Sequence, residues 1–164
     1  MLSGSSFDGV YSDEYILAKN MSSVNKAGGE FTFVIDAGHG GVDGGAVGIN
    51  GVLEKDINLS VSLVLSDIFN AFGCSTLLVR SSDISVESEG KTIRERKKSD
   101  IRNRFSLIKE NPGCIYLSIH QNKYSSASAK GAQMFFTPDN LNSNQLAASI
   151  QSNISGKGQS YNKR

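Results

Sequence analysis

The 164-residue sequence has no tryptophan and only two prolines, two cysteines and two histidines. Cys74 and Cys114 lie far apart, so neither a disulfide framework nor a zinc site built on paired cysteines is indicated. No apolar run approaches the ~20 residues of a membrane span, and no signal peptide is visible. Because 17 basic residues face 16 acidic ones, the formal net charge is +1. No global field therefore points to nucleic acid or to a membrane surface.

The composition that remains is typical of a soluble globular protein, with 38% hydrophobic and 20% charged residues. Such a length suits one domain with a real core. Residues 1–30 are polar and weakly patterned, and we expect them to form a loosely ordered lead-in. The domain itself is predicted over residues 31–164.

Strand and helix patterns alternate from residue 31 onward. Helices are predicted from apolar spacing and from their end signals; they cover Glu54–Phe72, Ser99–Lys109 and Asn144–Ile154. The first of them has one apolar face, formed by Ile57, Val61, Val64, Leu65, Ile68 and Phe72. Short buried strands are predicted at Phe31–Asp36, Thr76–Arg80, Ile115–His120 and Ala132–Thr137. This alternation indicates a three-layer α/β fold, with a mainly parallel twisted sheet and helices on both faces.

Both histidines follow predicted strands. His39 lies just past the first strand and His120 ends the third, so both fall at the carboxyl edge of the sheet, where ligands bind in such folds. Glu54 begins the first helix, which starts at the same edge. Two histidines and one glutamate leave an open fourth position, as in a catalytic Zn²⁺ site. The glycines around His39 would give the backbone room beside a metal.

Simpler interpretations of these residues stay open. Each histidine alone could be a hydrogen-bonded cap, and Glu54 could interact only with the helix dipole. Asp36 could accept a hydrogen bond from the far N–H of a ligand imidazole and fix its tautomer, or it could simply form a turn. A phosphate site is not favoured, because Asp43 replaces the third glycine of G-x-G-x-x-G.

Seven of the seventeen basic residues gather in Lys91–Arg104, against two acidic ones. We interpret this stretch as a solvated loop and helix face. The alternative is a patch that meets an anionic polymer.

Six segments, taken in order, resemble the zinc-dependent N-acetylmuramoyl-L-alanine amidases, which are peptidoglycan hydrolases. They are VIDAGHGGVDGGAVG (34–48), LEKDINL (53–59), LLVR (77–80), RNRFSLI (102–108), YLSIHQN (116–122) and GAQMFF (131–136). Their spacing is most similar to the germination and spore-cortex type. Ala37 stands where a proline is usual in the family.

The resemblance implies that His39, Glu54 and His120 bind Zn²⁺. It implies a peptidoglycan or muropeptide substrate, cleaved at the amide between N-acetylmuramic acid and L-alanine, and a place in the cell wall outside the cytoplasmic membrane. The family's general base is a glutamate on a late strand, and no residue up to Arg164 matches it. We therefore expect weak hydrolysis by this chain alone, or a need for an activator or a complementing C-terminal segment. The alternative function is a zinc-retaining cell-wall binding domain.

Overall fold

The computed structural model describes residues 32–88, 90–123, 130–159 and 161. They fall into two compact units, which divide between Asn122 and Lys123. The predicted lead-in, residues 1–30, lies outside the described residues. Each unit is treated by itself below.

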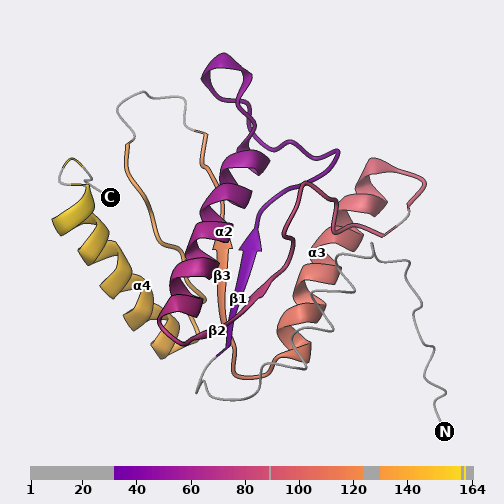
Figure 1. Cartoon of the computed structure of the whole chain (residues 1–164). Helices are drawn as coiled ribbons and strands as arrows, with labels where there is room; N and C mark the ends of the chain where they lie inside the picture. The colour runs from indigo at the N-terminus through magenta and orange to yellow at the C-terminus, as the bar shows by residue number, and fades with distance from the viewer. Residues whose placement is uncertain (1–31, 89, 124–129, 160, 162–164) are drawn as a thin grey trace, which may run out of the picture. The chain divides into compact units, whose positions relative to one another are not determined.

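The first unit is built on a three-stranded parallel sheet (Figure 1). Strand β1 (Thr32–Ala37) lies in the centre, with β2 (Ser75–Leu78) on one side and β3 (Ile115–Ile119) on the other. The last four residues of β1 are buried, as expected for a strand covered on both faces. The core consists of Val34, Leu77, Val79, Val86 and Leu107, with Cys114 and Tyr116 packed against it.

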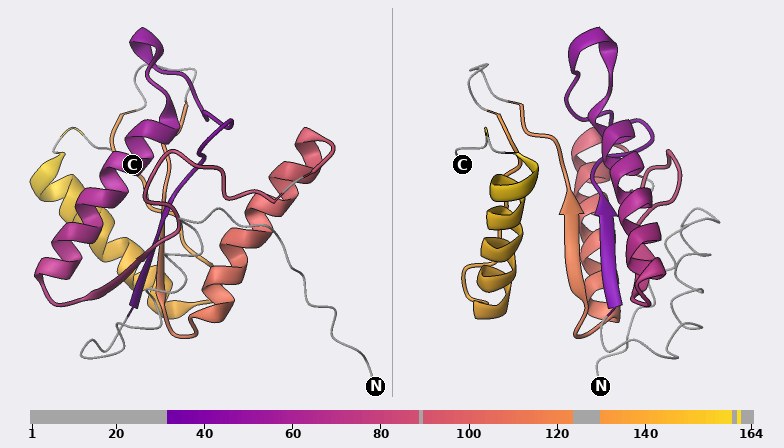
Figure 2. Two further views of the ribbon diagram at one scale, coloured as in Figure 1. Left: turned by 45° about the vertical axis from the view of Figure 1, so that its right-hand side comes forward. Right: turned by 60° about the vertical axis from the view of Figure 1, so that its left-hand side comes forward.

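Two helices cover opposite faces of this sheet (Figure 2). Helix α2 (Glu54–Ala71) meets one face, where Phe69 stacks on Phe33 with ring centroids 4.1 Å apart. Helix α3 (Ile93–Glu110) meets the other face, where Leu107 packs in the core cluster with Val34. Successive residues of a strand point to opposite faces, so Phe33 points to the face that α2 covers and Val34 to the face that α3 covers. The predicted α/β fold with a parallel sheet is confirmed.

Helix α2 turns a polar face to the sheet. Its buried residues are Glu54, Asn58, Ser62 and Ser66, four residues apart and therefore on one side of the helix. The predicted apolar face lies beside this side, not on it, because Ile57 is 39% exposed and Phe72 is 82% exposed. Two features fix the rotation of α2 about its axis. The Glu54 side chain points to the edge of the sheet, and the Ser66 hydroxyl lies 2.8 Å from the hydroxyl of Thr76 on β2.

Helix α3 begins six residues before its predicted start. Thr92 caps it: its hydroxyl accepts a hydrogen bond from the Glu95 backbone N–H at 3.2 Å, and the Glu95 carboxylate accepts one from the Thr92 N–H at 3.0 Å. This reciprocal capping box satisfies two otherwise unpaired donors of the first turn. The basic stretch is thus helical along most of its length.

The second unit contains helix α4 (Leu141–Asn153), followed by a short π-helical turn, Ile154–Gly158. The strand predicted at Ala132–Thr137 is wrong, since no residue of this segment belongs to a strand in the described part of the chain. Glutamine side chains form hydrogen bonds with the backbone of this segment instead. Gln151 accepts from the Met134 N–H at 2.9 Å, and Gln159 accepts from the Ala132 N–H at 2.7 Å.

Among the described residues, no helix combines the length and the apolar character that crossing a membrane requires.

Candidate metal centre

The strand order β2-β1-β3 places the carboxyl ends of β1 and β3 side by side. The chain leaves β1 towards α2 on one face, and it reaches β3 from α3 on the other face. The carboxyl ends of neighbouring parallel strands meet at one edge, which is where open α/β sheets bind ligands. His39 follows β1 and His120 follows β3, so both lie at this edge.

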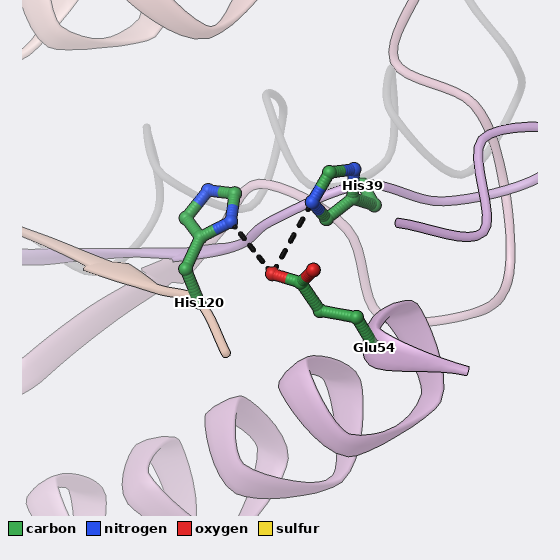
Figure 3. A group of neighbouring side chains, drawn as sticks. All are labelled: His39, Glu54 and His120. Carbon is green, nitrogen blue, oxygen red and sulfur yellow. Dashed lines mark hydrogen bonds and ion pairs between the residues drawn. The ribbon is translucent and has the colours of Figure 1, made fainter. Parts of the chain in front are cut away.

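His39, Glu54 and His120 converge there (Figure 3). One ligand atom from each lies within 4.8 Å of the others. Glu54 Oε1 is 3.2 Å from His39 Nε2 and 3.0 Å from His120 Nδ1. The two imidazole rings meet edge to face, with centroids 5.0 Å apart. The structure thus brings together the three residues predicted as metal ligands.

Glu54 is held as a carboxylate. Burial alone would raise its pKa, but backbone N–H groups of Ala46 and Gln121 donate to it, each at 2.9 Å, and both imidazoles face it. Together these contacts outweigh burial and lower the pKa of Glu54 to about 2. The side chain is therefore ionised and ready to bind a cation throughout the neutral range.

Asp43 orients the His39 imidazole. Its carboxylate lies 3.1 Å from His39 Nδ1, on the side of the ring away from Glu54. Burial would raise the pKa of Asp43, but the bond with His39 and the Gly45 N–H lower it overall. An Nδ1–H donated to this carboxylate leaves Nε2 unprotonated and directed at the centre, as a metal-binding histidine requires.

The loop after β1 approaches its neighbours too closely for side chains at two positions. A Cβ on Gly38 would lie 2.3 Å from His120 Cε1. Gly45 has a φ of +68°, and a Cβ there would lie 2.7 Å from His39 Cδ2 and 2.8 Å from Glu54 Oε2. His39 itself has a φ of 63°, a left-handed conformation uncommon outside glycine. These glycines make room for the convergence.

A buried arginine holds the backbone that aims His39. Arg80, which is 1% exposed, donates from Nε to the Ala37 carbonyl at 2.9 Å and from Nη2 to the Gly38 carbonyl at 3.1 Å. It also donates to the Lys55 carbonyl at 2.8 Å, in the first turn of α2. One guanidinium thus ties the end of β1 to the start of the helix that carries Glu54.

A second arginine supports the same loop from the α3 side. Arg104 donates to the His39 carbonyl at 3.0 Å and to the Ala37 carbonyl at 3.2 Å. It forms a buried ion pair with Asp36, whose other oxygen accepts a hydrogen bond from the Tyr116 hydroxyl. Burial works against the charged guanidinium, but Asp100 and Asp36 raise the pKa of Arg104 overall.

Asp36 was predicted either to fix the tautomer of a ligand imidazole or to form a turn, and the structure gives it other partners. Its two oxygens engage Arg104 and Tyr116, and Asp43 is the carboxylate that meets His39. Sequence reasoning singled out neither Arg80 nor Arg104. The available signal was their place in two of the segments that resemble the family, LLVR (77–80) and RNRFSLI (102–108).

Asn58 was also missed, although it lies one helical turn after Glu54 on the buried side of α2. It donates to the Gly38 carbonyl at 3.1 Å, and its own carbonyl oxygen accepts from the Gln121 amide at 3.3 Å. It therefore links α2 to the residues that follow both strands.

The donor set fits a zinc ion. Two imidazole nitrogens and one ionised carboxylate are ligands that Zn²⁺ prefers, and three protein ligands leave a position open for water or substrate. The second ring nitrogen of His39 has a carboxylate partner, and Glu54 has two backbone donors. The fold and this site define a class, an α/β protein with a parallel sheet and a His-Glu-His cluster at the carboxyl edge that could hold a metal ion.

Comparison with known proteins gives the family. A family model described as N-acetylmuramoyl-L-alanine amidase matches residues 33–164. The germination-specific N-acetylmuramoyl-L-alanine amidase of Bacillus subtilis (strain 168) is 37% identical over 121 residues, which are 73% of this chain and 51% of that protein. The amidase AmiA of Escherichia coli (strain K12) is 29% identical over 137 residues, which are 82% of this chain and 43% of AmiA.

Among solved structures, the CwlD amidase from Clostridioides difficile, in complex with the GerS lipoprotein, matches with a TM-score of 0.77 and 33% identity. The match covers 82% of this chain and 70% of that one. The chain therefore belongs to the N-acetylmuramoyl-L-alanine amidase family, and the resemblance seen in the sequence is confirmed. This chain spans about half the length of the curated relatives that it matches.

Proposed function

We propose that the chain carries the zinc centre of a peptidoglycan hydrolase that cleaves the amide between N-acetylmuramic acid and L-alanine. The observation that supports this most directly is the convergence of His39, Glu54 and His120 at the edge of the sheet in a member of this family. The site would act outside the cytoplasmic membrane, on the cell wall.

In this proposal His39, through Nε2, Glu54 and His120 hold the metal. Zinc bound there supplies Lewis-acid polarisation of the scissile carbonyl and activation of the attacking water. Asp43 keeps the proton on the outer nitrogen of His39. Arg80 and Arg104 fix the loop carbonyls, so the His39 ring keeps its direction when substrate binds. The general base is not assigned to a residue of this chain.

The experiment is cleavage of a defined muropeptide by the zinc-loaded chain, followed by mass spectrometry of the released stem peptide. We expect release that is lost in Glu54→Gln, which keeps the shape of the side chain and removes its charge. Zinc binding and muropeptide binding without any cleavage, even at long times, would favour the wall-binding alternative.

A further inference from the structure

The first turns of α3 carry positive charge that the metal centre does not use. Six basic residues between positions 91 and 102 are at least partly exposed: Lys91, Arg94, Arg96, Lys97, Lys98 and Arg102. Two of them lie near acidic side chains: Arg96 is 3.5 Å from Glu87, and Lys97 lies near Asp43. The helix begins at the carboxyl edge of the sheet, which is also the edge of the metal centre.

Lys97 lies next to Asp43, the residue that contacts the predicted metal ligand His39. Its Nζ lies 3.9 Å from Asp43 Oδ2, and the same carboxylate oxygen lies 3.1 Å from His39 Nδ1. The Lys97 side chain is 64% exposed, and the pair with Asp43 is at the outer limit of an ion pair. Such a long, exposed pair contributes little energy, so the ammonium is free to take another anion.

A cleft lies beside the start of α3. Its volume is about 670 Å³, and it is lined by Ser85, Glu87, Ser88, Gly90, Lys91 and Arg96. Ser85 connects the cleft to the loop after β1, because its hydroxyl donates to the Gly40 carbonyl at 3.4 Å. Gly40 follows His39 directly, so the cleft reaches the loop that carries His39. Its wall has two basic side chains, Lys91 and Arg96, and one acidic side chain, Glu87, which lies 3.5 Å from Arg96.

We propose that Lys97 is a specificity-determining residue that binds the carboxylate of the acidic residue following L-alanine in the stem peptide, and that the adjoining cleft takes the rest of that peptide. This inference rests on the proposed function. Each residue of an extended peptide spans about 3.3–3.6 Å, so this carboxylate lies roughly 7 Å from the scissile amide. That reach suits an ammonium separated from His39 only by Asp43.

The chemistry explains why a lysine suits this position. Its ammonium is a compact charge on a flexible stem, so it can leave Asp43 and meet a ligand carboxylate without rearranging the backbone. The Asp43 carboxylate would still hold the His39 ring, because the contact with Nδ1 does not involve Lys97. Asp43 would thus lie next to both Lys97, which binds the ligand carboxylate, and His39, which binds the metal.

The test uses two ligands that differ by one charge and have the γ-carboxyl blocked: N-acetylmuramoyl-L-alanyl-D-glutamate γ-methylamide, whose α-carboxylate is free, and its α-amide. Their affinities are measured by titration calorimetry on the chain freed of zinc by a chelator, because the zinc-loaded chain is proposed to cleave both ligands, and mass spectrometry checks that each ligand stays intact. We expect the acid to bind about fivefold more tightly than the amide, the upper range for an exposed charge pair. Lys97→Gln should remove this preference by weakening the acid alone, and Lys97→Arg should restore it.

Arg102→Gln is the matched control, since it removes the same charge from an exposed position of α3 on another side of the helix. It should keep the preference for the acid. Equal affinity of the two ligands for the wild type, or an unchanged preference in Lys97→Gln, would overturn the inference. Failure of both ligands to bind would overturn it too. Zinc content and muropeptide cleavage, measured on a separate zinc-loaded sample, would then judge the proposed function separately.

Discussion

Arg104 and Asp36 form a buried ion pair directly beneath the loop that carries His39. Asp36 is 2% exposed and Arg104 is 8% exposed, and both belong to elements that meet behind the metal centre, β1 and α3. The same guanidinium also donates to the backbone carbonyls of Ala37 and His39. Charge and backbone support are therefore combined in one side chain.

Removal of that guanidinium should destabilise the fold. Arg104→Met would leave the Asp36 carboxylate buried without its countercharge, a loss that typically costs about 3–5 kcal/mol. The free energy of unfolding, measured by urea denaturation, should fall by this order. The double variant Asp36→Asn with Arg104→Met should recover part of the loss, because no charge is then left unpaired. A single variant within about 0.5 kcal/mol of wild type would show that the pair contributes little to stability.

Gly45 should be required by the metal centre and not only by the backbone. Gly45→Ala would strain a residue at a φ of +68° and drive its Cβ into His39 and Glu54. Gly51→Ala is a matched control, since Gly51 has a φ of +77° but a Cβ there meets nothing within 4 Å. We expect both variants to lose similar backbone stability, and only Gly45→Ala to lose zinc affinity. Equal zinc affinity in the two, measured by competition with a chromogenic chelator, would contradict this account of the loop.

Asp43 should affect the metal through the tautomer of His39. Asp43→Asn removes the charge that holds the Nδ1 proton, and loss of such a partner typically costs 10–100-fold in metal affinity. The same chelator competition measures it, and Asp56→Asn on the exposed side of α2 serves as the control. Unchanged affinity in Asp43→Asn would indicate that His39 is oriented by its backbone alone.

Local patterns predicted most of the first unit. The apolar runs at β1 and β3 and the helix from Glu54 agree closely with the structure, and the position of both histidines at one sheet edge follows from parallel strand order. The convergence of the three predicted metal ligands could be anticipated because each lies at the end of an element. Ends of neighbouring parallel strands must meet, whatever the details of packing.

Tertiary contacts decided what the patterns could not. The rotation of α2 depends on Glu54 and on the contact between Ser66 and Thr76, and apolar spacing carries no information about either. Asp36 and Asp43 are both acidic residues close to His39 in sequence, and only the placement of Arg104 shows which of them is already engaged. At Ala132–Thr137, glutamine side chains from later in the chain replace the expected strand partners.

The most direct test of the central claim is the zinc content of the purified chain, measured by elemental analysis in the wild type and in His120→Ala. His120 is 48% exposed, so its removal should leave the fold intact, as circular dichroism can verify. We predict about one zinc per wild-type chain, removed by a strong chelator and absent from the folded variant. A well-folded wild type without zinc after incubation with the metal, or a variant that retains it, would contradict a metal centre at His39, Glu54 and His120.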